Sequence, residues 1–294
     1  MSGNIDVTRI AGNIGALNAL NSLSYVNQNL ALHQTRLATG KRLNFAFEDP
    51  AGFNLATTFD VRRQGLQVVL RAMGDSSNLL STMDGGLRKI QDILVKMKSK
   101  ALEAIGDTIG ASERAAVSAQ LADYVAEIDQ IVNQTQWNGK VLIGGSGQWG
   151  ADTLSFLVDA DGGSVGFQFS TAAGGSSGFM SAMLTTLNGG LSGGSIGVSN
   201  SAMARDYSDV VVAALDKVRR GVMDVGSFQA RLQFKEETLK VQYTNVESAY
   251  NRIMNANMAE EQVEASKFAI LQQTATAMLA QANVAPQFIL SLFQ

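Results

Sequence analysis

Two short stretches of the sequence contain residue types that could bind a ligand. Residues 145–150, GSGQWG, match the G-x-G-x-x-G pattern of a loop that binds dinucleotide phosphates. A strand pattern follows them in place of the helix N-terminus that would face a phosphate, so we interpret them as an ordinary loop. Asp159 and Asp161 resemble the first ligands of a calcium loop. No glutamate follows where the bidentate ligand would stand, so we interpret this stretch as a turn.

A third candidate for chemistry is His33, the only histidine of the chain. The sequence has no cysteine, which excludes thiolate catalysis, disulfides and cysteine-ligated metals. No serine and aspartate are spaced so as to form a catalytic triad with the histidine. We therefore interpret His33 as a packed or interfacial polar residue. The sequence predicts that the protein is not an enzyme and has no metal site and no cofactor.

The composition is that of a globular protein built from long helices. The chain has 294 residues, of which 46% are hydrophobic, and only two are prolines. A formal net charge of −3 gives no reason to expect a nucleic-acid partner. The N-terminus lacks a basic segment followed by an apolar run, so no cleavable secretion signal is expected.

Both ends of the chain are almost free of charge. Residues 268–294 contain no Asp, Glu, Lys or Arg, and between Ile10 and Thr35 only His33 can be charged. Five glutamines in the C-terminal stretch argue against a membrane span, so no membrane insertion is expected. Apolar residues recur every seven positions in both stretches, which predicts that the ends pair as a coiled coil and assemble with other copies. This core assembly seam comprises Leu23, Leu30, Leu37, Val263, Ile270, Ala277 and Val284.

The N-terminal helix is expected at 13–39, ending at Gly40. Between the two ends, the spacing of apolar residues predicts three further helices, and the second helix of the chain is expected to begin after the Asp49–Pro50 pair. A third is expected from Ser112 to a turn at 134–139, and a fourth from about 204 to 253. An apolar stripe of alternating four and three spacing gives the shell helix seam: Leu66, Leu80, Leu87, Leu94, Leu215, Val222, Leu232 and Leu239.

The middle of the chain differs in composition. Residues 144–197 contain 15 of the 29 glycines, and two alternating runs around 154–158 and 165–169 predict one β-hairpin. The expected fold class is mainly α: a long antiparallel helical coiled coil or bundle made by the paired N- and C-terminal segments, with a small β-hairpin insert.

Several motifs, in order, resemble those of the bacterial flagellins. They are RLATGKRLN at 36–44, EDPAG at 48–52, QTQWNG at 134–139, ILQQ at 270–273, LAQAN at 279–283 with PQ at 286–287, and LSL at 290–292. The resemblance covers nearly everything except the insert. It implies a subunit that is secreted without a cleaved signal and polymerises into the extracellular flagellar filament for swimming. A hook–filament junction protein of the same family is the alternative.

The resemblance also implies how the chain divides into structural regions. Residues 1–40 plus 258–294 would form the inner core coiled coil, 41–139 plus 205–257 the helical shell domain, and 140–204 the Gly/Ser-rich outer insert. The implied partners are other copies of the chain in a helical filament, a flagellar export chaperone, and filament cap or junction proteins.

Overall fold

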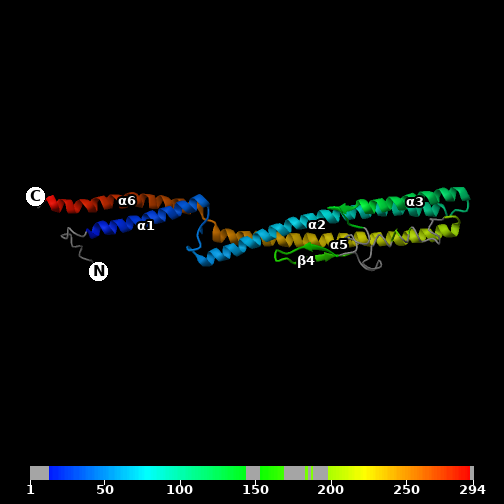
Figure 1. The fold of residues 1–294 in the computed structure, drawn as a ribbon, viewed down its shortest axis with the longest axis horizontal. Coiled ribbons are helices and arrows are strands. Elements are labelled where there is room, and N and C mark those ends of the chain that lie inside the picture. Colours follow the sequence, from blue (N-terminus) through cyan, green and yellow to red (C-terminus); the bar gives the residue numbers. More distant parts are fainter. Residues whose placement is uncertain (1–12, 144–152, 169–182, 185–186, 188–197, 292–294) are drawn as a thin grey trace. The chain divides into compact units, whose positions relative to one another are not determined.

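The computed structural model describes residues 13–143, 153–168, 183–184, 187 and 198–291. Its helices are long and its strands short (Figure 1), which confirms the expected mainly α fold with a small β-hairpin. The elements in chain order are α1 (Ile14–Thr39), α2 (Pro50–Glu103), α3 (Ala111–Gln134), β1 (Gln136–Trp137), β2 (Lys140–Val141), β3 (Leu154–Leu157), β4 (Ser164–Phe167), α5 (Ser201–Met254) and α6 (Met258–Ser291). Within the residues described, no helix is long and apolar enough to cross a membrane.

The chain divides into two compact units. The first comprises Met1–Arg63 with Thr244–Gln294, and the second comprises Gln64–Tyr243. The boundaries fall inside α2 and α5, so each unit contains part of both helices. This division differs from the three regions expected from the sequence, and those regions stay a prediction about the assembled state.

The helix ends follow from local residues. The Asn13 side chain accepts a hydrogen bond from the Ala16 amide at 2.9 Å and so caps α1. Gly40 ends the helix in the left-handed conformation, with φ of 69°, and its amide donates to the Arg36 carbonyl. Asp49 accepts from the Gly52 amide at 2.9 Å at the start of α2. The predicted boundaries at 13, 40 and 49–50 are therefore confirmed.

In the first unit, α1 and α6 lie side by side and run antiparallel (Figure 1). The Asn13 amide group donates to the Ala282 carbonyl at 2.7 Å, and Gln272 Nε2 donates to Asn27 Oδ1 at 2.7 Å. The residue number of the partner on α6 therefore decreases as the residue number on α1 increases, which is the antiparallel arrangement. The predicted pairing of the two ends is confirmed.

A small apolar core lies beside the connector between α1 and α2. It consists of buried Leu43, Ala56 and Met254. Backbone hydrogen bonds from Arg42 to the Met254 carbonyl at 2.7 Å and from Ala256 to the Gly40 carbonyl at 3.0 Å tie the two chain segments together. The connector is therefore held to the C-terminal half of the chain by backbone bonds and by side-chain packing.

In the second unit, the apolar stripes of α2 and α5 are buried. Seven residues of the predicted shell helix seam are buried and Val222 is half-buried. At Gly86 of α2, the missing side chain lets Thr135 and Ile143 approach the helix closely. A Cβ at this position would stand 2.6 Å from Thr135 Oγ1 and 2.9 Å from Ile143 Cδ1. The residues of the shell helix seam therefore lie on the protein-facing side of each long helix, and their role as a seam between assembled copies stays a prediction.

The hairpin of β3 and β4 packs against α5 through aromatic side chains. Leu154 pairs with Phe167 and Leu157 with Ser164 in an antiparallel register. Phe156 and Phe167 place their ring centroids 5.4 Å and 5.0 Å from that of Phe228 on α5. The predicted hairpin is confirmed for the described part of the insert.

Candidate assembly interface

The face of α6 that meets α1 combines larger side chains with alanines. Glu261, Phe268 and Gln272 contact α1 directly, and Ala265 is buried. Together with Ala275, Leu279 and Ala282 these residues repeat by four and three along one side of the helix. Small side chains allow the two helices to approach closely, because interaxial distance depends on the residues at the contact.

The predicted seam residues of α6 lie on its other side. Val263, Ile270 and Val284 are 66%, 64% and 42% exposed, and Ala277 is also exposed. We call these four residues the exposed seam. The pairing of the chain ends therefore does not use them, and their role as an assembly seam stays a prediction that depends on other copies of the chain.

The predicted seam residues of α1 are less exposed than those of α6. Leu23, Leu30 and Leu37 are half-buried. In the N-terminal half of the same helix, four large apolar side chains are exposed: Ile14, Leu17, Leu20 and Tyr25. The pair of helices thus presents apolar side chains of both α1 and α6 to the outside.

A shallow groove of about 400 Å³ lies between the two helices. Its lining is small or apolar, with Ser22, Asn18 and Thr274 as the polar contributors. The groove contains no charged side chain, so it offers nothing that would bind an ion or position a reacting group. It suits contact with another protein surface of low charge.

One polar cluster interrupts this uncharged pair of helices. His33 Nδ1 lies 2.5 Å from Glu261 Oε2, and Arg36 lies between Glu261 and Glu48. The sequence reading of His33 as an interfacial polar residue gave no partner, because Glu261 is distant in sequence. Only the antiparallel pairing brings the two together.

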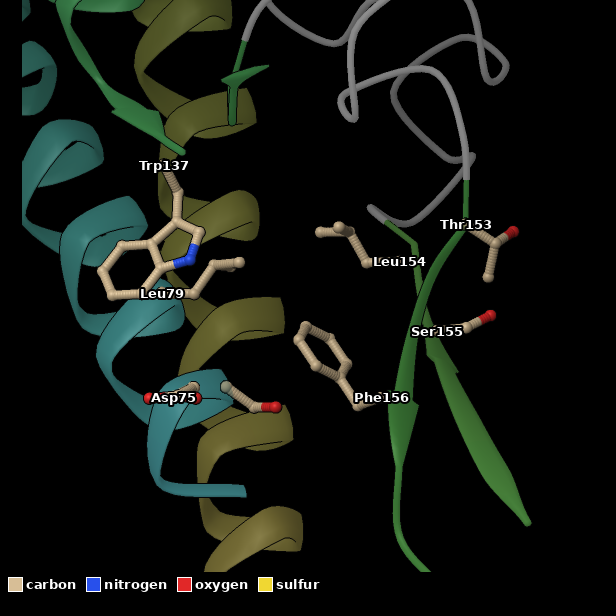
Figure 2. Close-up of a pocket in the computed structure, with 8 residues that line it drawn as sticks. Asp75, Leu79, Trp137, Thr153, Leu154, Ser155 and Phe156 are labelled. Carbon is tan, nitrogen blue, oxygen red and sulfur yellow. The ribbon is translucent and has the colours of Figure 1, made fainter. Parts of the chain in front are cut away.

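The second unit has a separate pocket of about 470 Å³ (Figure 2). Leu79 and Trp137 line one side of it, and Leu154 and Phe156 of β3 project toward them from the other. Asp75 is its one charged lining residue, so it lacks the convergent acid, base and nucleophile that an active site needs. Nor do any three His, Asp or Glu side chains within the described ranges come together as metal ligands.

Comparisons with known proteins agree with this architecture. The bacterial flagellin N-terminal helical region matches residues 10–148, and the bacterial flagellin C-terminal helical region matches residues 208–293. Flagellin FlaB1 of Treponema pallidum is 26% identical over 286 residues, covering 96% of this chain and 98% of the relative. The flagellin of Bacillus subtilis is 29% identical over 311 residues, covering 97% and 100%.

A solved structure shows that the fold recurs. A putative flagellar hook-associated protein from Vibrio parahaemolyticus superposes with a TM-score of 0.56 at 12% identity, over 71% of this chain and 100% of the other. At that identity the likeness concerns the fold alone. The two terminal matches together span most of the residues, including the helix pair and the long helices of the second unit. The chain therefore belongs to the bacterial flagellin family.

Proposed function

We propose that this chain is the structural subunit of a flagellar filament, and that copies polymerise through the outer faces of α1 and α6. The observation that carries the proposal is the exposed seam together with the exposed apolar residues of α1. A single uncovered aliphatic side chain is common on protein surfaces, but such residues on both helices of a nearly uncharged pair favour burial against other protein.

The low charge of this pair supports the same proposal. Packing many copies side by side would bury their outer faces, and a buried charge without a partner costs far more than a buried amide or hydroxyl that is hydrogen-bonded. Residues 268–294 have no Asp, Glu, Lys or Arg. Their polar positions are mostly Gln, Thr and Asn, which can form hydrogen bonds to neighbouring copies.

Within the filament we assign residues 1–40 plus 258–294 to the inner core, 41–139 plus 205–257 to the surrounding helical shell, and 140–204 to the outer surface. We further propose that the chain is secreted before it assembles, with an export chaperone, and that it meets cap or junction proteins at the filament ends. The family resemblance supports these assignments, and the filament itself is an extracellular structure.

The test is seeded polymerisation of the purified chain. Intact chain added to short seeds of its own filament should give long tubes by negative-stain electron microscopy, and a chain lacking residues 268–294 should give none. A chain that only caps hook ends and never elongates would instead point to the junction-protein function.

A point variant makes the test sharper. Ile270→Gln keeps the length of the side chain but places an amide in the exposed seam. Because burying an isoleucine contributes about 1.5–3 kcal/mol, the monomer concentration left at equilibrium should rise by roughly tenfold or more. Ile270→Leu is the matched control and should leave that concentration nearly unchanged. Equal values for the two variants would contradict burial of the exposed seam.

A further inference from the structure

The face by which α6 meets α1 and the opposite face of the helix both carry apolar residues. Glu261 and Val263 are two residues apart, so at about 100° per residue their side chains project to nearly opposite sides of the helix. The side that meets α1 carries Phe268 and Leu279, and the opposite side carries Val263 and Ile270. Hydrophobic burial alone therefore does not decide which side meets α1. Another interaction can decide between them.

The polar cluster of His33, Arg36, Glu48 and Glu261 supplies such an interaction. Two side chains of α1 reach Glu261 at once: His33 Nδ1 donates to Oε2 at 2.5 Å, and Arg36 Nη1 donates to Oε1 at 3.5 Å. Arg36 Nη2 also donates to Glu48 of the connector at 3.4 Å. The cluster thus joins α1, the connector and the first turn of α6.

A second residue on the same face of α6, Phe268, also contacts the imidazole of His33. The ring of Phe268, seven residues after Glu261, stacks on His33 with a centroid distance of 5.3 Å and an interplanar angle of 18°. Residues spaced by seven lie on one side of a helix, so both contacts require the observed rotation of α6. Turning the exposed seam toward α1 would break the hydrogen bond from His33 to Glu261 and the stacking together.

Burial makes the loss of these contacts costly. The four side chains of the cluster are between 9% and 19% exposed. Elsewhere in the described residues, no ion pair joins α1 to α6. Glu264 and Lys267, in the next turns of α6, pair with each other. A charged group left without its partner in such a site is strongly unfavourable.

The geometry of the cluster indicates specificity more than added stability. The Arg36 contacts are long, and the buried atoms Arg36 Nε and Glu48 Oε1 have no hydrogen-bond partner within the described structure. A buried ionic group that is incompletely satisfied contributes little net stability, but it penalises every arrangement that separates its members. A polar residue at a core position of a coiled coil fixes the pairing in the same way.

We propose that the polar cluster selects the face of α6 that meets α1, and so keeps the exposed seam available to other copies of the chain. The first half concerns the single chain, and the second rests on the proposed function. Loss of the cluster is expected to let α6 rotate and bury Ile270 against α1.

Disulfide reporters test the choice of face in the full-length monomer, because the chain has no cysteine of its own. Asn27→Cys with Gln272→Cys reports the observed face, where the native side chains are hydrogen-bonded at 2.7 Å. Asn27→Cys with Ile270→Cys reports the rotated face. Both reporters remove the Asn27–Gln272 bond. The second also replaces Ile270, so each reporter is compared with and without the cluster variant.

Each reporter is then combined with Glu261→Ala or with the control Glu264→Ala. The control removes a carboxylate one turn away whose partner is on its own helix. In the otherwise unchanged chain and in the control, the 27–272 disulfide should dominate. In Glu261→Ala, the ratio of the 27–270 to the 27–272 disulfide should rise by about tenfold or more. His33→Ala should shift it in the same direction.

Three outcomes would overturn the proposal. They are equal yields of the two disulfides in the unchanged chain, an unaltered ratio in Glu261→Ala, and loss of both disulfides, which would mean that the cluster only holds the helices together. All are read in the monomer. If the chain forms filaments but the disulfide ratio does not change, face selection is refuted and the filament function still holds. If the ratio changes but no filaments form, face selection holds and the filament function is refuted.

Discussion

Phe228 is predicted to be the residue that holds the β3–β4 hairpin on the second unit. Its side chain is 6% exposed and contacts the rings of Phe156 and Phe167 at tilted angles of 44° and 54°. The hairpin has two strands of four residues each, and an isolated two-stranded hairpin is at best marginally stable in water. Phe228→Ala should therefore both destabilise the unit and release the hairpin.

The size of the effect follows from burial. Truncating a buried phenylalanine costs about 3–5 kcal/mol, and each aromatic contact accounts for roughly 0.5–1.5 kcal/mol of that in favourable cases. Such a loss is a large part of the roughly 5–15 kcal/mol that stabilises a typical domain. The free energy of unfolding is measured by denaturant titration followed by circular dichroism.

Phe234→Ala on the same helix is the matched control, because Phe234 is 71% exposed. Its effect should stay within about 0.5 kcal/mol. Hydrogen exchange gives an independent readout, since the Val158 amide, which donates to the Gly163 carbonyl at 2.9 Å, should lose protection in Phe228→Ala only. A difference below about 1 kcal/mol between the two variants, with unchanged exchange at Val158, would refute the reasoning.

Two further predictions concern α2 and α5. Gly86→Ala should lower the free energy of unfolding by about 1–3 kcal/mol, because the new Cβ would lie 2.6 Å from Thr135 Oγ1. Gly85→Ala, with no atom within 4 Å of the new Cβ, should instead raise it by roughly 0.5–1 kcal/mol, and the same sign for both in thermal denaturation would contradict the close approach. Tyr207→Phe should leave stability unchanged or raise it, because the buried hydroxyl has no hydrogen-bond partner among the described residues. Burial raises the pKa of Tyr207 by disfavouring the phenolate, so its stabilising contribution is full below the ordinary tyrosine pKa of about 10 and falls as pH rises above it. The stability of Tyr207→Phe relative to the unchanged chain should therefore increase between pH 9 and 11, roughly the range around that pKa, and a flat difference would contradict it.

Much of the fold was predictable because local residues set the helix boundaries. Gly40 ends α1 through its positive φ, and the Asp49–Pro50 pair starts α2 through a side-chain cap and a preset backbone angle. The four–three spacing identified the buried side of each long helix, as Leu80 and Leu232 show. These features depend on neighbours within a few turns of one chain segment, so the sequence contains them.

The candidate site was only partly predictable, for a physical reason that α6 illustrates. The sequence by itself determined that the chain ends are helical, nearly uncharged and able to pair. It also showed a seven-residue repeat, but α6 has two such repeats, one through Val263 and Ile270 and one through Glu261 and Phe268. Both repeats carry apolar residues, so hydrophobicity does not choose between them, and the tertiary structure uses the second for the contact with α1. The deciding partners lie more than two hundred residues away in sequence, and only the antiparallel pairing of α1 and α6 brings them within hydrogen-bonding distance.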